Sequence, residues 1–328
     1  MSALVTGGHG FAGSWLVRAL LERGEQVRVL DRPEPRLTDV GTPRPSALAL
    51  HGIDGEVELF EADLRDAVSI SRAVQGTDAV FHLAAQTIVG NAAADPREAY
   101  EVNVLGTRNV MEACRDHEVG RVVFASSDKA YGASDELPYR EDFPLRAVHP
   151  YDASKAAADI LARTYWRSHQ LPVAVTRFAN LYGGGDLNFS RLVPEAVSAV
   201  LDGRRPVIRS DGTPQRDFLY VEDAARAYLA IADALDGDAA RGEAFNAGGG
   251  EPHAVADVLR LIAELAETDL QPDIRGSGNP EGEIDRQYVD STKLSEMTGW
   301  RPQVDLREGL GRTIEWYREH PEVRAPAG

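Results

Sequence analysis

The sequence contains few residues of several kinds, and each shortage limits what the protein can be. Its 328 residues include one cysteine, Cys114, which excludes an intrachain disulfide and suits a reducing compartment, so we expect a cytoplasmic protein. Cys114 lies in a helical pattern, TRNVMEACRDH, where it should fill a core position. No apolar run approaches the roughly 18 residues of a membrane span. A strand begins at once, in MSALVTGG, and leaves no room for a signal peptide.

Positive charge and metal-binding patterns are also scarce. The formal net charge is −17 and the pI about 4.9, which argues against nucleic acids and anionic membranes as partners. The histidines are scattered without ligand spacing, so we expect no metal site. Lysine occurs only at Lys129, Lys155 and Lys293, while arginine takes nearly every other basic position. Because a lysine can be tuned to lose its proton and an arginine cannot, these lysines are candidate functional residues.

Apolar, strand-like runs alternate with amphipathic helical runs through the first half of the chain. We expect strands at 2–7, 26–31, 57–63, 79–85, 121–127 and 172–180, and helices at 11–24, 67–76, 98–117 and 151–169. This alternation predicts a parallel sheet covered on both faces, a doubly wound α/β fold of the Rossmann type. The segment 33–55, rich in Pro, Gly and Ala, indicates an inserted surface loop with room for a short helix.

After residue 180 the regular alternation of strands and helices ends, and short strands and turns mixed with helices follow. The change predicts a smaller C-terminal α/β lobe on the carboxyl edge of the sheet, where ligands bind in such folds. We expect the Rossmann domain to take residues 1–178 and about 214–245, and the smaller lobe to take about 179–213 and 246–322.

A glycine-rich turn, TGGHGFAG, joins the first strand to the first helix. Gly8, Gly10 and Gly13 match the dinucleotide spacing G-x-G-x-x-G, and Gly7 gives the related G-x-x-G-x-x-G. Such glycines let the backbone approach a pyrophosphate, which then lies on the positive end of the helix that begins at Phe11. A merely structural glycine turn is the alternative, but the position after the first strand of a βαβ unit favours a dinucleotide.

Asp31 ends the second strand, where a carboxylate accepts hydrogen bonds from the adenosine ribose. A carboxylate there repels the 2′-phosphate of NADP, so Asp31 favours NAD as the cofactor. Arg32 next to it is of the type that binds such a phosphate, and an ordinary surface acid at position 31 is the other interpretation.

Tyr151 and Lys155, in YDASK, are four residues apart and share one helix face. The reference pKa of tyrosine, near 10, is too high for a base at neutral pH, and a neighbouring ammonium and a positive nicotinamide ring would both lower it. Such a pair is common on surface helices. The dinucleotide turn and the serine-rich strand end in FASSDKAYG are what favour catalysis here.

The chain resembles the extended short-chain dehydrogenase/reductase family that modifies nucleotide sugars, in TGGHGFAG, DLRD, HLAA, NVLGT, SSDKAYG, PYDASK, RFANLYGGGD and QRDFLYVED. The resemblance covers nearly the whole chain and implies an NAD-dependent enzyme with Ser127, Tyr151 and Lys155 as its catalytic triad. Tyr151 would remove the C4 hydroxyl proton of the sugar while hydride passes from C4 to NAD⁺. The implied cofactor contacts beyond the glycine turn and Asp31 are Asp63, Leu64, Leu83, Ala84, Ala85 and Asn103.

Asp128 and Lys129 follow the catalytic serine, where the branches of this family differ. Epimerases generally carry small or unreactive residues there. The pair resembles the acid/base couple of 4,6-dehydratases, notably the CDP-glucose type with its SDK, whereas the dTDP-glucose type carries Asp-Glu. The implied roles are Lys129 as the base at C5 and Asp128 as the acid at the C6 hydroxyl. A solvated Asp-Lys pair on a loop is the alternative.

Those roles set two physical conditions. Adjacent Asp and Lys side chains normally ionise as a pair, but the roles need the neutral tautomer, which a closed, dry site favours. Neighbours on a strand point to opposite faces of the sheet, so Asp128 and Lys129 can reach one sugar only if the chain turns after Ser127.

Arginines near the predicted crevice are suited to an anionic substrate, because guanidinium binds phosphate oxygens in bidentate fashion. The candidates for substrate binding are Gln86, Asn180, Arg191, Leu192, Arg209 and Arg216. The resemblance assigns Asn180 and Arg216 to the diphosphate, while Arg209 fits an ordinary surface residue equally well. Many similar proteins place another arginine before a Gly-acid pair, where this chain has Glu281 before Gly282 and Glu283.

The function expected from the sequence is an NAD-dependent nucleotide-sugar 4,6-dehydratase. One alternative is a nucleotide-sugar 4-epimerase, in which Asp128 and Lys129 only shape the pocket. Another is a dinucleotide-binding sensor without catalysis, which the complete triad disfavours. The helices at 98–117 and 152–168 are rich in apolar residues, and in similar proteins they pair about a two-fold axis as a four-helix bundle, so we expect a homodimer.

Overall fold

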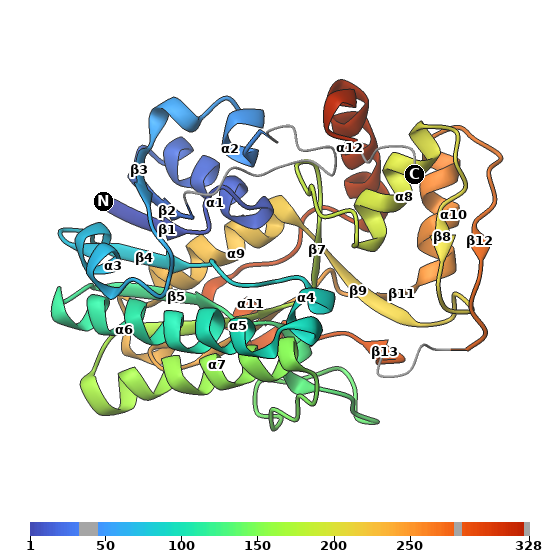
Figure 1. The fold of residues 1–328 in the computed structure, drawn as a ribbon. Coiled ribbons are helices and arrows are strands. Elements are labelled where there is room, and N and C mark those ends of the chain that lie inside the picture. The colour runs from blue at the N-terminus through green and yellow to red at the C-terminus, as the bar shows by residue number, and fades with distance from the viewer. Residues whose placement is uncertain (33–44, 279–283, 325–328) are drawn as a thin grey trace.

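A computed structural model describes residues 1–32, 45–278 and 284–324 of the chain. Its largest element is a seven-stranded, fully parallel sheet in the order β10-β6-β5-β4-β1-β2-β3 (Figure 1). The doubly wound fold class expected from the sequence is confirmed. The strands are β1 (Ser2–Thr6), β2 (Gln26–Asp31), β3 (Glu58–Glu61), β4 (Ala79–His82), β5 (Arg121–Ala125), β6 (Val173–Phe178) and β10 (Ala244–Ala247).

Six of these strands lie where the apolar runs of the sequence predict them. The central strands are buried on both faces, as all six residues of β6 show, and this is why they appear as almost continuous apolar runs. The seventh strand, β10, comes from the four-residue run AFNA, which is too short to stand out in the sequence. It extends the sheet beside β6.

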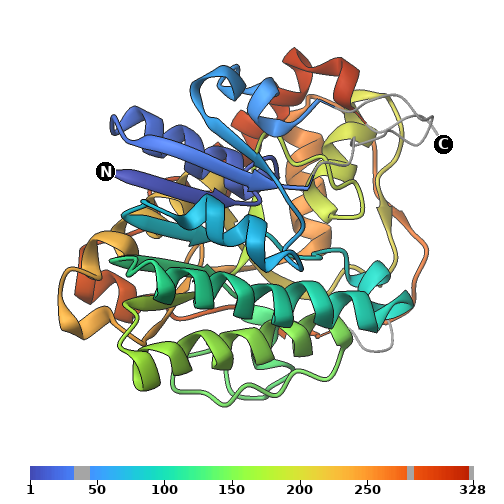
Figure 2. The ribbon, with the colours of Figure 1, turned by 60° about the vertical axis from the view of Figure 1, so that its left-hand side comes forward.

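Helices cover both faces of the sheet, and Figures 1 and 2 both show α6 and α7 running side by side on one of them. That face carries α3 (Ala67–Val74), α6 (Thr107–Asp116) and α7 (Pro150–His169), and the other carries α1 (Phe11–Glu22) and α9 (Val221–Ala234). Each face buries its own apolar cluster. Cys114 on α6 belongs to one of them, so its expected core position is confirmed.

The single helix expected at 98–117 is interrupted. α5 (Pro96–Tyr100) leads into a π-helical turn, η2 (Glu101–Gly106), before α6 begins. π turns are rare and often occur at functional sites, and this one carries Asn103. A further short helix, α4 (Val89–Ala94), lies before α5 and is not predicted by the sequence pattern.

The smaller C-terminal lobe is built around β9 (Gln215–Tyr220). This strand pairs with β7 (Asn180–Tyr182), β11 (Pro252–Ala254) and β13 (Arg286–Gln287), and a separate pair joins β8 (Val207–Ile208) to β12 (Asp273–Ile274). One apolar cluster holds the lobe's helices together, α8 (Leu192–Leu201), α10 (Val255–Leu265) and α12 (Leu306–Glu319). The exact division of the chain into two domains stays a prediction.

Parts of two sequence expectations fall outside the described residues. Of the loop expected at 33–55, residues 33–44 lie outside them, and the rest contains the short helix α2 (Ala47–Leu50). Glu281, Gly282 and Glu283 also lie outside. Within the described ranges, no helix has the length and apolar character needed to cross a membrane, and no acidic, His or Cys side chains gather as a metal site.

Candidate active site

The predicted glycine turn between β1 and α1 accepts only glycine at two of its positions. Gly7 has φ +77°, a conformation that side chains disfavour. A Cβ on Gly13 would lie 2.2 Å from the Gly7 carbonyl oxygen, because the helix packs directly against the turn. α1 begins at Phe11, after Gly10, with no side-chain cap and no acid in its first turn. The backbone N–H groups at this positive helix end fit the pyrophosphate of a dinucleotide.

Asp31 stands beside this turn, at the end of β2. Its carboxylate accepts hydrogen bonds from the backbone N–H groups of His9, at 3.1 Å, and Arg32, at 2.9 Å. Asp31 therefore fixes the turn and also places negative charge where an adenosine ribose binds in this fold. Arg32 itself is exposed.

The end of β4 meets the glycine turn directly. A Cβ on Gly7 would lie 2.8 Å from the Ala84 nitrogen, and the Ala84 N–H donates to the Thr6 hydroxyl at 3.1 Å. Leu83 and Ala85 flank Ala84 and are half-buried. These three predicted cofactor contacts thus lie next to the turn that would hold the pyrophosphate.

Asp63 and Leu64, the expected adenine contacts, follow β3. Leu64 is buried against Gly106, where a Cβ would come within 2.7 Å of its side chain. Asp63 instead forms a bidentate ion pair with Arg65, with both contacts at 2.8 Å, and these hydrogen bonds hold the pKa of its carboxyl below the usual value.

Asn103, in the π turn, joins the loop after β4 to the start of α7. Its side chain exchanges two hydrogen bonds with the backbone of Gln86, at 2.7 and 3.1 Å, and donates to the Ser154 hydroxyl at 2.9 Å. The Ser154 hydroxyl in turn donates to the Tyr151 carbonyl at 2.7 Å. Asn103 therefore supports the first turn of α7, from which Tyr151 extends.

The expected triad comes together at the carboxyl end of β5. Lys155 is 4% exposed, and its ammonium donates to the carbonyl of Ala125, the last residue of β5, at 2.7 Å. Burial lowers the pKa of Lys155 to about 8. Ser127, two residues beyond the strand, lies close enough to the Tyr151 phenol to lower its pKa.

Taken together, the protein's own groups do not lower the pKa of Tyr151, contrary to the expectation from its neighbouring ammonium. Burial raises the pKa of Tyr151 to about 12. Arg191 opposes the rise, while the negative charges of Asp152 and Asp128 add to it. A positive nicotinamide ring beside the phenol would oppose this rise and favour the phenolate.

The chain turns directly after Ser127, as the proposed roles of Asp128 and Lys129 require. A 3₁₀ turn, η3 (Asp128–Tyr131), has Ser127 as its N-cap, and the Ser127 hydroxyl accepts a hydrogen bond from the Lys129 N–H at 3.2 Å. Because the backbone leaves the strand here, the two side chains are not forced to opposite faces. Asp128 is 3% exposed and Lys129 is half-buried.

The pKa of Asp128, the carboxylic acid of this turn, is shifted from its ordinary value. Burial raises its pKa to about 6 even though the positive charge of Lys129 and a hydrogen bond from Ser127 oppose the rise. Oδ1 accepts from the Ser127 hydroxyl at 3.3 Å, whereas Oδ2 is buried and has no hydrogen-bond partner within the described ranges. A carboxyl with this pKa holds its proton part of the time near neutral pH, which suits a general acid.

Gln287 is a neighbour of Asp128 that the sequence pattern did not identify. It lies on β13, is 1% exposed, and its amide helps to hold the pKa of Asp128 down. Neither amide atom makes a hydrogen bond of normal geometry to another described residue. No sequence signal marks a glutamine on a two-residue strand as part of a site.

Asp217, on β9, also faces this cluster. Its carboxylate accepts from the N–H groups of Gly249, at 2.7 Å, and Val289, at 3.3 Å, so it orders the segments on which they lie. Burial raises the pKa of Asp217 to about 7, and the charge of Asp128 adds to this rise.

Arg191 is one of the substrate-binding candidates whose charge acts on the proposed catalytic residues. It is the N-cap of α8, just before Leu192, and its guanidinium pairs with Asp186 at 3.0 Å. Its charge reaches both Asp186 and Tyr151. Arg191 is therefore near enough to Tyr151 for its charge to favour the phenolate.

Asn180 and Arg216 lie on neighbouring strands of the smaller lobe. The Asn180 amide donates to the Asp217 carbonyl at 3.2 Å, and the Arg216 guanidinium donates to the carbonyls of Gln215, at 2.9 Å, and Asp285, at 3.2 Å. Arg216 also lowers the pKa of Asp128 by its charge. Arg209, just beyond β8, is exposed, and among the described residues no hydrogen bond or ion pair joins it to Asn180 or Arg216.

Comparison with known proteins places this geometry in one family. The profile of the NAD dependent epimerase/dehydratase family matches residues 3–248. The chain belongs to this family. A dTDP-glucose 4,6-dehydratase of Streptomyces griseus is 35% identical to it, over 99% of this chain and 97% of that protein.

Solved structures of this epimerase/dehydratase family include both kinds of enzyme. A dTDP-glucose 4,6-dehydratase double mutant from Streptomyces venezuelae, with NAD and DAU bound, has a TM-score of 0.88 and 32% identity, with 99% of each chain covered. A UDP-glucose 4-epimerase from Thermotoga maritima, with UDP-glucose, has a TM-score of 0.86 and 28% identity, with 98% of this chain and 100% of that chain covered. The backbone fold is similar in the dehydratase and the epimerase, so the side chains must decide which reaction takes place.

Proposed function

We propose that this NAD-dependent family member is a nucleotide-sugar 4,6-dehydratase. The observation that carries the proposal is Asp128, a buried carboxyl whose pKa is raised to about 6, next to Lys129 on the turn that follows Ser127. A 4-epimerase needs no acid at C6, because it only returns hydride to C4. The curated dTDP-glucose 4,6-dehydratases, which are similar to this chain over nearly their full length, support the proposal.

The first step uses the redox pair, by which we mean Tyr151 and Lys155. Bound NAD would supply the hydride acceptor for C4 and the hydride donor for C6. Tyr151, as phenolate, takes the proton of the C4 hydroxyl, and Ser127 donates a hydrogen bond that orients the reacting oxygen. Lys155, held by the Ala125 carbonyl, supplies positive charge beneath the cofactor site.

The second step uses the elimination pair, by which we mean Asp128 and Lys129. A ketone at C4 acidifies the C5 hydrogen, and the neutral amine of Lys129 removes it. Asp128 gives its proton to the C6 oxygen, which leaves as water. Burial of Asp128 disfavours its ionised form and so favours the protonated acid that this step needs.

The substrate in this proposal is a nucleotide-diphosphate hexose, for which Arg191, Arg216 and Asn180 are the candidate contacts. Overall similarity favours dTDP-glucose, which curated relatives use by name. The Asp128-Lys129 pair instead resembles the CDP-glucose type, because the dTDP-glucose type carries Asp-Glu. Both nucleotides therefore belong in the assay.

A 4-epimerase is the second candidate, and the Thermotoga maritima structure supports it by its similarity over nearly the whole chain. Proton NMR in heavy water decides between the two. The protein is incubated with NAD⁺ and, separately, with CDP-glucose, dTDP-glucose, UDP-glucose, UDP-N-acetylglucosamine and GDP-mannose. A C6 methyl signal with deuterium at C5 is expected; inversion at C4 without a methyl would establish the epimerase instead.

We also propose a cytoplasmic homodimer formed through α5, η2, α6 and α7. Large apolar side chains are exposed along these elements, namely Tyr100, Leu105 and Ile160, and α6 and α7 lie side by side (Figure 2). Burial of these side chains against a second copy would stabilise the assembly. Light scattering that finds a monomer at working concentration contradicts this proposal.

A further inference from the structure

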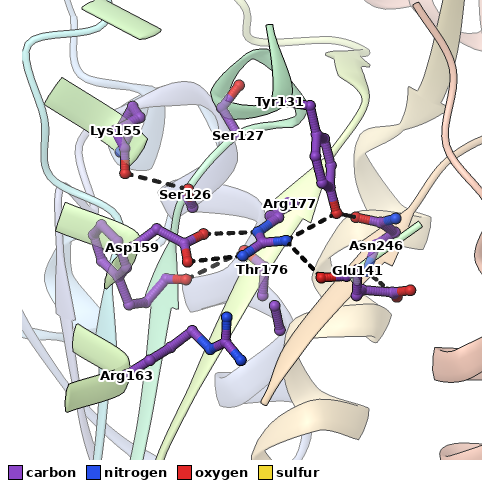
Figure 3. Close-up of polar contacts among 12 residues, drawn as sticks. Ser126, Ser127, Tyr131, Glu141, Lys155, Asp159, Arg163, Thr176, Arg177 and Asn246 are labelled. Atoms are coloured by element: carbon purple, nitrogen blue, oxygen red, sulfur yellow. Dashed lines mark hydrogen bonds and ion pairs between the residues drawn. The ribbon is translucent and has the colours of Figure 1, made fainter. Parts of the chain in front are cut away.

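A buried polar network joins the two elements that carry the catalytic groups (Figure 3). Its centre is Arg177 on β6, which is 1% exposed. The guanidinium donates two hydrogen bonds to the carboxylate of Asp159, at 2.8 and 2.9 Å. Asp159 is fully buried and lies on α7, one turn after Lys155, whose pKa its charge raises against the effect of burial. One side of the network is therefore fixed to the helix of the redox pair.

The other side of the same guanidinium is bound to η3. Its Nη1 donates to the Tyr131 hydroxyl at 3.0 Å, and Tyr131 donates onward to Asn246 Oδ1 at 2.8 Å. Nη1 also donates to the Glu141 carbonyl at 3.2 Å. Tyr131 is the last residue of η3, three positions after Asp128, so the network reaches the turn of the elimination pair.

Arg177 differs in kind from the arginines considered for the substrate. Its Nε, Nη1 and Nη2 all donate to protein groups, and the side chain is buried together with its acidic partner. Removing one member of such a buried pair leaves an uncompensated charge, so the arrangement is held tightly. Arg177 is therefore placed to orient other residues and not to bind a phosphate.

We propose that Arg177 and Tyr131 are positioning residues that set where the elimination pair lies relative to the redox pair. The inference rests on the proposed dehydratase function, in which both pairs act in turn on one bound sugar, at C4 and then at C5 and C6. Because the sugar stays in place between these steps, the two pairs must keep a constant separation. A displacement of about 1 Å is enough to cost about 100-fold in rate.

Tyr131→Phe tests the proposal with little change of shape. It removes the hydroxyl that Arg177 binds but keeps the ring, which stacks on Tyr139 with centroids 4.8 Å apart. The matched control is Tyr165→Phe. Tyr165 is also buried and lies on α7, but its hydroxyl donates to Glu112 at 2.6 Å, away from the network.

The first measurement is amide hydrogen exchange, which needs no substrate. In Tyr131→Phe, exchange of residues 128–132 should accelerate about tenfold while the middle of α7 keeps its protection, and Tyr165→Phe should leave η3 unchanged. Unchanged exchange in η3 overturns the proposal. Should Tyr131→Phe not fold, Asn246→Ser, which replaces the acceptor of the Tyr131 hydroxyl, is expected to give the same result.

The second measurement separates the two chemical steps. Formation of reduced nicotinamide after mixing with substrate reports C4 oxidation, and methyl formation reports elimination. Tyr131→Phe should slow elimination about tenfold and oxidation less than threefold, so that the oxidised sugar accumulates. An equal loss in both steps indicates a merely structural role and overturns the proposal. If the wild-type protein forms no methyl product, the dehydratase proposal fails, and hydrogen exchange alone still decides whether Arg177 and Tyr131 hold η3.

Discussion

The redox pair and the elimination pair are held in different ways. Tyr151 and Lys155 extend from α7, a 20-residue helix, and the Lys155 ammonium is bound to the Ala125 carbonyl at 2.7 Å. Asp128 and Lys129 stand on a four-residue 3₁₀ turn, where Lys129 is anchored through its backbone N–H and one Asp128 oxygen is buried without a partner among the described residues. In the proposed mechanism, C4 oxidation thus uses groups on a long helix, and elimination uses groups on a short turn.

Burial acts on both pairs, in opposite directions. It lowers the pKa of Lys155 to about 8 and raises that of Asp128 to about 6, so each group moves toward its neutral form. For the carboxyl this favours the acid that an elimination needs. For the lysine it means that its positive charge is lost as the pH rises above about 8. Substitutions and changes of pH should therefore distinguish the contribution of the redox pair from that of the elimination pair.

The largest expected effect comes from breaking the redox pair. Tyr151→Phe removes the only hydroxyl assigned to the C4 proton, and without oxidation at C4 the C5 hydrogen is not acidic. Both C4 oxidation and elimination should fall about 10³-fold. Stopped-flow absorbance of reduced nicotinamide and methyl formation by NMR measure the two steps. Elimination that persists without detectable oxidation would separate the steps and contradict the common mechanism.

Breaking only the elimination pair should have a narrower effect. Lys129→Met keeps the length of the side chain but removes the amine, so methyl formation should fall about 10²-fold while C4 oxidation stays within about threefold. Lys293→Met is the matched control, since Lys293 pairs with Glu243 at 2.7 Å on α11 (Thr292–Thr298) and has no assigned role. A normal rate of methyl formation in Lys129→Met means that Lys129 is not the C5 base.

The two regions also differ in how far the sequence predicted them. The glycine turn and the YDASK helix follow from spacing, because a turn after the first strand and a four-residue interval each fix geometry locally. The environment of Asp128 depends on Gln287 and Asp217, which lie far along the chain, on the paired strands β13 and β9. No local pattern encodes that packing. The lysine that was expected to lower the pKa of Tyr151 is likewise bound to a carbonyl that spacing does not reveal.

Asp128→Asn should lose methyl-forming activity and gain stability. The folded-state pKa of Asp128, about 6, lies above its ordinary value of 3.8, so the wild-type protein loses stability as the pH rises through this window. Asparagine does not ionise, and the variant should be more stable by about 3 kcal/mol above pH 7 and by roughly half as much near pH 5, because the loss begins at the unfolded pKa of 3.8. Urea unfolding at both pH values measures the difference. If the difference in stability between Asp128→Asn and the wild type is the same at both pH values, Asp128 is not perturbed. Methyl formation should be lost in either case.

The smallest expected effect is a shift in the pKa of Asp128 when its neighbour Gln287 is replaced. The Gln287 amide holds the pKa of Asp128 down, so Gln287→Leu should raise that pKa by roughly half a unit. Elimination needs protonated Asp128 and falls as the pH rises through its pKa, so the upper limb of the rate profile for methyl formation should move to higher pH. The profile of C4 oxidation should move less, because Asp128 acts on Tyr151 only through its charge. Gln271→Leu, at an exposed position of the smaller lobe, is the control. A limb that moves to lower pH would mean that the amide stabilises the protonated acid and not the carboxylate.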